Sequence, residues 1–148
     1  MTRQILLVED NPADEKLTLR ALKSCGVANE VAVVHDGAEA LDYMFATGRY
    51  AHRDAAHLPT LILLDLKLPR IEGVEVLRRL RADERTRVVP VVVLTSSKED
   101  EDVARSYASG ANAYVRKPVD FNEFVATAKT LGVFWLLINE PAPIPRAS

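Results

Sequence analysis

The sequence predicts an α/β fold with a doubly wound parallel sheet, on three observations. Strand-like and helix-like segments alternate five times along its 148 residues. The strand-like runs are almost continuously apolar, without the in/out alternation of a half-exposed strand, which indicates strands covered by helices on both faces. Right-handed crossovers leave few other arrangements for five consecutive strand–helix units.

The expected strands are short runs rich in valine, leucine and isoleucine. They cover residues 4–8, 31–34, 61–64, 91–94 and 113–115. Helix start signals follow these runs. Asn11 supplies an N-cap and Pro12 a proline at the first helical position, so a helix is expected from there to about Ser24.

The later helices are expected from capping residues and apolar stripes. Spacings of the capping-box type begin at Asp36, Ser97 and Asp120. The second helix carries an apolar stripe of Leu41, Met44 and Phe45, and the third one of Val74, Leu77 and Leu80.

Composition excludes several classes of protein. A net charge of −2 gives no electrostatic footprint for nucleic acid or for an anionic membrane. A single cysteine, Cys25, excludes an internal disulfide framework and suits a reducing compartment. No apolar run approaches the roughly 20 residues that span a bilayer. We therefore expect a cytoplasmic protein that binds neither nucleic acid nor membrane.

Two segments exceed the minimal strand–helix pattern. Residues 47–60 form a long connection that carries His52 and His57, and we favour a surface loop over a metal site because no cysteine or carboxylate cluster accompanies them. Residues 141–148 contain three prolines and are expected to be a disordered tail. The expected organisation is one domain over 1–140, with an extended last helix, followed by this tail.

Polar residues follow four of the expected strands at their carboxyl ends. Glu9 and Asp10 follow the first strand, Asp65 the third, Thr95 the fourth and Lys117 the fifth. In an open parallel sheet, ligands bind at this edge. Each residue alone is more often a cap, a turn residue or a solvated charge. Their joint occurrence in this order favours a functional site.

The residue types at this edge indicate phosphoryl chemistry. Three crowded carboxylates repel one another and need a cation, and hard oxygen ligands suit Mg²⁺. A neutralised Asp65 could then act as a nucleophile toward a phosphoryl group and form an acyl phosphate. Lys117 would stabilise the charge on the phosphoryl oxygens, and Thr95 would hydrogen-bond one of them.

Four motifs resemble the receiver domain of two-component response regulators. They are ILLVEDN (5–11), LILLDLKLPRIEG (61–73), VVVLTSS (91–97) and AYVRKPVD (113–120). The resemblance implies a flavodoxin-like (βα)₅ sheet with strand order 2-1-3-4-5. It implies Asp65 as phosphoacceptor, and Mg²⁺ bound by Glu9, Asp10, Asp65 and the backbone carbonyl of Lys67. Thr95 resembles the switch hydroxyl, Lys117 the charge sensor and Tyr114 the switch aromatic, although a strand tyrosine is often simply a packing residue.

The resemblance implies a signalling switch rather than a turnover enzyme. The expected function is a single-domain response regulator that receives a phosphoryl group on Asp65 from a sensor histidine kinase and can pass it to a histidine phosphotransfer protein. The long 47–60 connection and the terminal VFWLLINEP (133–141) resemble stand-alone regulators that partner bacterial phytochromes. The alternative is a phosphorylation-independent interaction module that has kept the fold.

The end of the chain carries a surplus of large apolar side chains. Phe134, Trp135, Leu137 and Ile138 point in more directions than one packing face can use. Exposed aromatic residues of this kind indicate an interface, so we expect a homodimer. The alternative is that this segment folds back over its own sheet.

Overall fold

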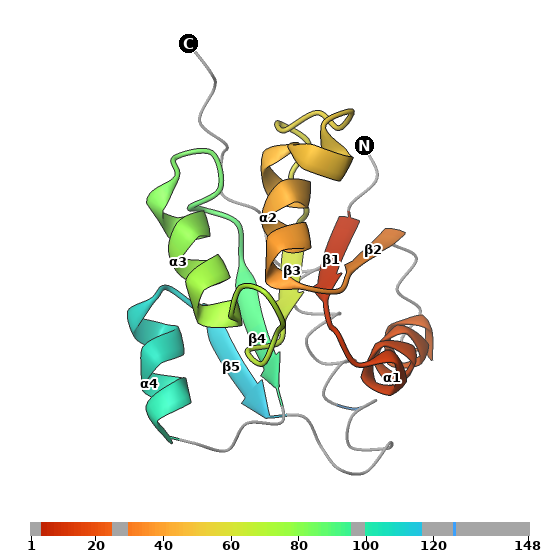
Figure 1. Ribbon diagram of the computed structural model, residues 1–148. Helices are drawn as coiled ribbons and strands as arrows, with labels where there is room; N and C mark the ends of the chain where they lie inside the picture. Colours follow the sequence, from red (N-terminus) through yellow and green to blue (C-terminus); the bar gives the residue numbers. More distant parts are fainter. Residues whose placement is uncertain (1–3, 25–29, 96–99, 117–125, 127–148) are drawn as a thin grey trace.

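The computed structural model describes residues 4–24, 30–95, 100–116 and 126. Within these ranges it forms a five-stranded parallel sheet with strand order β2-β1-β3-β4-β5 (Figure 1). The strands are β1 (Gln4–Val8), β2 (Glu30–Val34), β3 (Leu61–Leu64), β4 (Val91–Thr95) and β5 (Ala113–Arg116). The predicted α/β class, the five strands and their order are confirmed.

The described helices are α1 (Pro12–Ser24), α2 (Gly37–Phe45), α3 (Gly73–Ala82) and α4 (Asp100–Ala108). In the described part of the chain, none of them combines the length and hydropathy that a bilayer crossing needs. The helix expected after Asp120 and the tail at 141–148 lie outside the described residues.

Two helix starts use the expected capping residues. Asn11 Oδ1 accepts hydrogen bonds from the backbone N–H groups of Ala13 and Asp14, at 2.9 and 3.1 Å. Asp36 Oδ1 accepts from the N–H of Glu39 at 2.7 Å. These bonds satisfy donors that the first helical turn leaves unpaired.

The second hydrogen bond of the capping box at α2 differs from the usual one, in which the glutamate accepts from the N–H of the cap residue itself. Glu39 Oε1 accepts from the N–H of His35 at 2.8 Å, one residue before the cap. The other oxygen of Glu39 is therefore left for the segment that follows α2, described below.

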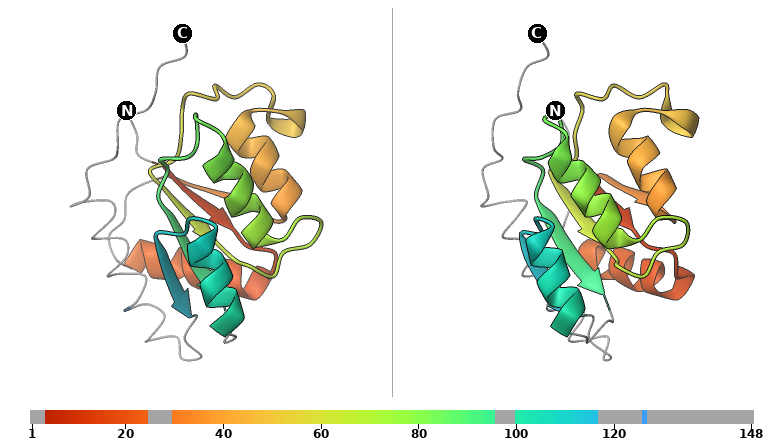
Figure 2. Two further views of the ribbon diagram at one scale, coloured as in Figure 1. Left: turned by 90° about the vertical axis from the view of Figure 1, so that its left-hand side faces the viewer. Right: turned by 60° about the vertical axis from the view of Figure 1, so that its left-hand side comes forward.

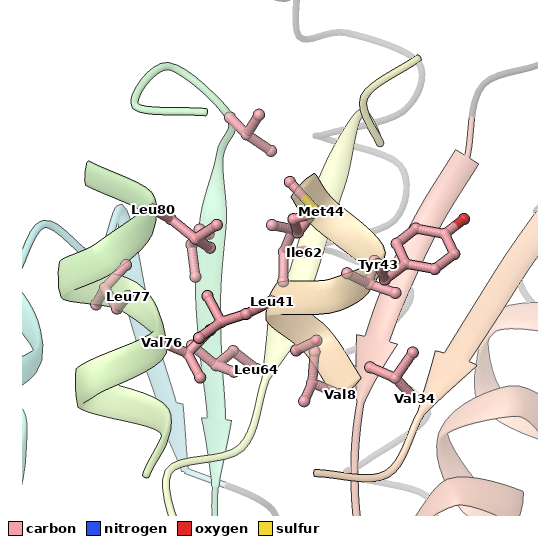
Figure 3. Packing of buried hydrophobic residues seen from close by; sticks show 14 of the residues in the cluster. Val8, Val34, Leu41, Tyr43, Met44, Ile62, Leu64, Val76, Leu77 and Leu80 are labelled. Atoms are coloured by element: carbon pink, nitrogen blue, oxygen red, sulfur yellow. The ribbon is translucent and has the colours of Figure 1, made fainter. Parts of the chain in front are cut away.

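Alternate residues of the central strands face two separate cores. One core lies under α2 and α3, which cover the same face of the sheet (Figure 2), and Figure 3 shows Leu41 of α2 and Val76 of α3 meeting at Leu64 of β3. The second core places Leu22 of α1 against Ile5, Leu7, Leu61 and Leu63 on the opposite face. This double coverage explains the continuous apolar runs of β1, β3 and β4, because both faces of these central strands are buried.

The long connection between α2 and β3 is packed onto α2. It begins with a 3₁₀ turn, η1 (Gly48–Tyr50). The ring of Tyr50 lies edge-on to Tyr43 at 5.0 Å, and the guanidinium of Arg53 lies 3.7 Å over the Tyr43 ring. The connection ends where the N–H of Thr60 donates to the carbonyl of Gln4 at 2.7 Å. His52 and His57 are exposed, as expected for a surface segment.

Glu39 is the polar anchor of this connection. Its Oε2 accepts from the Tyr50 hydroxyl at 2.6 Å and from Arg49 at 3.1 Å. Burial, followed by the hydrogen bond and the negative charge of Glu39, raises the pKa of Tyr50 to about 12. The segment is therefore held to α2 by both ring packing and charge-assisted hydrogen bonds.

Candidate functional site

Three carboxylates meet at the carboxyl edge of the sheet. Glu9 and Asp10 follow β1 and Asp65 follows β3, and one carboxylate oxygen of each lies within 4.8 Å of the others. The register explains the meeting: Val8 pairs with Leu64, so the two neighbouring strands end at the same level. The sequence prediction that these three residues converge is confirmed.

The members of this cluster differ in exposure. Glu9 is 1% exposed and Asp65 is 7% exposed, whereas Asp10 faces solvent. The N–H of Asp65 donates to the carbonyl of Val8 at 3.1 Å, and its Oδ1 accepts from the N–H of Lys67 at 3.2 Å. Asp65 is thus held by β1 on one side and by its own loop on the other.

Charge makes this arrangement suitable for a cation. Two unit charges 4.8 Å apart repel by about 3 kcal/mol at an effective dielectric constant of about 20. A divalent cation between the carboxylates would replace this repulsion with attraction. Carboxylate oxygens, with an exposed side that leaves room for water, are the donor set that Mg²⁺ prefers.

The loop from β3 to α3 depends on a close approach at Gly73. A Cβ at this position would lie 2.3 Å from the carbonyl oxygen of Asp65, closer than any side chain tolerates. The N–H of Gly73 also donates to the carbonyl of Leu66 at 3.0 Å. Glycine at the start of α3 is therefore required for the loop to turn back against Asp65.

A second glycine joins the same loop to α2. A Cβ on Gly37 would lie 2.0 Å from the carbonyl oxygen of Ile71, and the N–H of Gly37 donates to the carbonyl of Pro69 at 3.4 Å. Sequence reasoning placed Gly37 only inside a capping box and missed this contact. The glycine itself was the available signal, because a first-turn position in a helix seldom needs one.

The structure describes some of the remaining predicted site residues and not others. Thr95 is the last residue of β4, which neighbours β3, so its backbone lies at the same edge as Asp65. Tyr114 lies in β5 opposite Val93. The part of Lys67 that the structure brings to Asp65 is its N–H; metal binding by its carbonyl stays a prediction. Lys117 and the four expected interface residues lie outside the described residues.

Fold and site together define a class of protein. Residues 5–129 match the family model of the response regulator receiver domain. The chain belongs to this family.

Several relatives are stand-alone phytochrome regulators. The chain is 54% identical to the bacteriophytochrome response regulator AtBRR, with a TM-score of 0.76 over 95% of this chain and 99% of that one. It is 38% identical to the phosphorylated cyanobacterial phytochrome response regulator RcpA, with a TM-score of 0.87 over 99% and 100% of the chains.

A third relative, the response regulator Rcp1 of Synechocystis sp., is 35% identical over 97% of this chain and 93% of its own length. The structure of the Mn²⁺-bound form of Rcp1 matches with a TM-score of 0.87 and 33% identity, over 95% and 99% of the chains.

Proposed function

We propose that this chain is a phosphorylation switch that accepts a phosphoryl group on Asp65 from a sensor histidine kinase. The observation that carries the proposal is a buried Asp65 beside Glu9 and Asp10 at the end of a central strand. A carboxylate that is mostly shielded from water, yet flanked by an exposed acidic residue, suits a nucleophile reached through a metal site.

The proposed transfer is a simple exchange of bonds. A carboxylate oxygen of Asp65 bonds to phosphorus while the phosphorus–nitrogen bond of phosphohistidine breaks. The histidine nitrogen keeps the electron pair and takes up a proton, and Asp65 becomes an acyl phosphate. Water later attacks the acyl phosphate, which releases inorganic phosphate and restores the carboxylate, so the chain acts as a switch and not as a turnover enzyme.

The metal in this proposal is Mg²⁺, held by Glu9, Asp10, Asp65 and the carbonyl of Lys67. When bound, it would neutralise the carboxylates and the incoming phosphoryl oxygens. Lys117 would stabilise charge on the transferred group and Thr95 would hydrogen-bond one of its oxygens. Tyr114 would respond as the switch aromatic. The Mn²⁺-bound form of Rcp1 supports a divalent cation in this family.

The proposed sensor is a phytochrome-type kinase. Support comes from AtBRR and RcpA, both of which are phytochrome response regulators that align with nearly the whole chain. A photoreceptor histidine kinase would deliver the phosphoryl group to Asp65, and a histidine phosphotransfer protein could receive it afterwards.

The proposed output is a protein–protein contact. Phe134, Trp135, Leu137 and Ile138 form an aromatic and aliphatic segment that fits a homodimer interface. In the competing arrangement, this segment covers the chain's own sheet.

The first experiment exposes the protein to acetyl phosphate and Mg²⁺ and measures intact mass. Wild type should gain one phosphate, and Asp65→Asn should gain none. Asp14→Asn, which changes an aspartate of α1 outside the acidic cluster, is the matched control and should be modified like wild type. An unmodified wild type, or modification that persists in Asp65→Asn, would favour the phosphorylation-independent module instead.

A further inference from the structure

Arg70 has a backbone conformation that arginine seldom adopts. It lies in the loop from β3 to α3, five positions after Asp65, with φ at 70°. This left-handed conformation brings Cβ too close to the backbone and costs about 1 kcal/mol for a residue other than glycine. Strain of this kind persists where the surrounding structure enforces it, and it collects at functional sites.

The neighbours of Arg70 enforce this conformation. Pro69 precedes it, and the carbonyl of Pro69 accepts hydrogen bonds from the N–H groups of Ile71 and Gly37, at 2.8 and 3.4 Å. Ile71 is pressed against Gly37 on the other side. Glycine would fit the turn without strain, so the backbone gives no reason for arginine.

The side chain of Arg70 points outward from the loop. The side chain is 71% exposed, and its Nη1 lies 4.0 Å from Asp36 Oδ2, the outer limit of an ion pair. Asp36 already uses Oδ1 to cap α2. A contact this long and this exposed contributes little to stability. The guanidinium is therefore exposed to a second molecule, on the same loop that begins at Asp65.

We propose that Arg70 is a specificity-determining residue that pairs with a carboxylate on the surface of the protein that donates the phosphoryl group. This inference rests on the function proposed above. The acidic cluster repels an acidic protein surface, and a cation on the same loop offsets that repulsion. The planar fork of arginine holds a carboxylate with two parallel hydrogen bonds, which fixes the orientation of the donor.

The test compares two donors that share a phosphorus–nitrogen bond. The protein donor is an autophosphorylated histidine kinase core, selected from a panel that includes bacteriophytochromes as the one that phosphorylates wild type fastest. The small donor is phosphoramidate with Mg²⁺. Arg70→Gly should raise the KM for the kinase core about tenfold, the effect of losing one interfacial ion pair, with kcat within about twofold. The rate with phosphoramidate should not change.

Two further variants separate recognition from local structure. Arg49→Gln removes a guanidinium of nearly equal exposure, 72%, that pairs with Glu39 away from the loop, and it should transfer like wild type. Asp36→Asn keeps a good N-cap but removes the charge beside Arg70, and it should also transfer at least as well as wild type.

Three outcomes would overturn the inference and leave the proposed function standing. They are a normal KM in Arg70→Gly, equal slowing with both donors, and slowing of the same size in Asp36→Asn. Two outcomes would overturn the proposed function as well: a wild type that phosphoramidate modifies but no kinase core does, and a wild type modified by neither donor.

Discussion

At the scale of single residues, Asp65 depends on atoms that other residues supply. Its carboxyl oxygen is positioned by the N–H of Lys67, and its carbonyl leaves room only for a glycine at position 73. Glu9 and Asp10 set the charge around it. The reactivity proposed for Asp65 is therefore a property of this small neighbourhood and not of an aspartate at a strand end.

Tyr50 gives a prediction on pH dependence. Because burial and Glu39 raise its pKa from 10.0 to about 12, the folded state favours the protonated phenol. The stability that this hydrogen bond contributes is fully present below about pH 10 and is lost as the pH rises through about 12. At neutral pH, Tyr50→Phe should lower the free energy of unfolding by about 1 kcal/mol.

Urea denaturation of both proteins over a series of alkaline pH values checks this prediction. The difference between wild type and Tyr50→Phe should shrink above about pH 10. A difference that stays constant over the whole alkaline range would show that the hydroxyl of Tyr50 does not hold the segment to α2.

At the scale of elements, the loop from β3 to α3 and the start of α2 behave as one unit. Gly37→Ala places a methyl group where the carbonyl of Ile71 lies, 2.0 Å from the new Cβ. Overpacking of this kind costs about 1–3 kcal/mol, and the loop must move to accommodate it. We expect a lower free energy of unfolding and slower modification by acetyl phosphate.

Ala38→Gly is the matched control for this contact, because it changes the next residue of the same helix. It should lose about 1 kcal/mol through helix propensity while keeping the wild-type rate of modification. If Gly37→Ala were phosphorylated at the wild-type rate, the contact would be structural only and the loop would not depend on α2.

A second tie between elements lies at the opposite end of α3. Arg81 donates to the carbonyls of Gly110, Arg87 and Val89 and to Asn112 Oδ1, at distances of 2.7–2.9 Å. Burial lowers the pKa of its guanidinium. One side chain therefore fixes the end of α3 to the turn that leads from α4 into β5.

At the scale of the whole molecule, most of the fold could be predicted from the sequence. Apolar runs predicted every described strand to within one residue at its ends. For β1, β3 and β4 the reason is burial on both faces, which leaves a pattern that depends on hydrophobicity alone. Caps such as Asn11 and Asp36 were predictable for a different reason: each cap forms its hydrogen bond within three residues along the chain.

Features that depend on contacts between distant segments were not readable. The approach of Gly37 to Ile71 and the four bonds of Arg81 join parts of the chain that no local pattern relates. The positive φ of Arg70 was missed as well, because arginine gives no sign of a left-handed conformation. The acidic cluster was predictable in spite of its long-range nature, since parallel strands bring their carboxyl ends to one edge.

Assembly is the whole-molecule prediction. If residues 134–138 form a homodimer interface, Trp135→Ala should raise the dimer dissociation constant by about tenfold or more, since a central tryptophan often dominates an interface. Sedimentation equilibrium at several protein concentrations measures this directly. Tyr107→Ala, an exposed aromatic change on α4, serves as the control. A wild type that is monomeric at high micromolar concentration would contradict the homodimer.

The packing of the 47–60 connection also bears on protein engineering. Between the Arg53 anchor and Thr60, the chain turns with the N–H of His57 donating to the carbonyl of Asp54 at 3.0 Å, and Ala56 at this turn is exposed. The connection lies at the end of the sheet opposite the carboxyl ends of the strands (Figure 1), and Asp65 directly follows the carboxyl end of β3. A fluorescent domain inserted after Ala56 would be joined to chain that is held on both sides, by Arg53 against Tyr43 and by Thr60 against Gln4. It would leave the acidic cluster accessible. The chain could in this way carry an internal optical reporter while both of its termini stay unmodified.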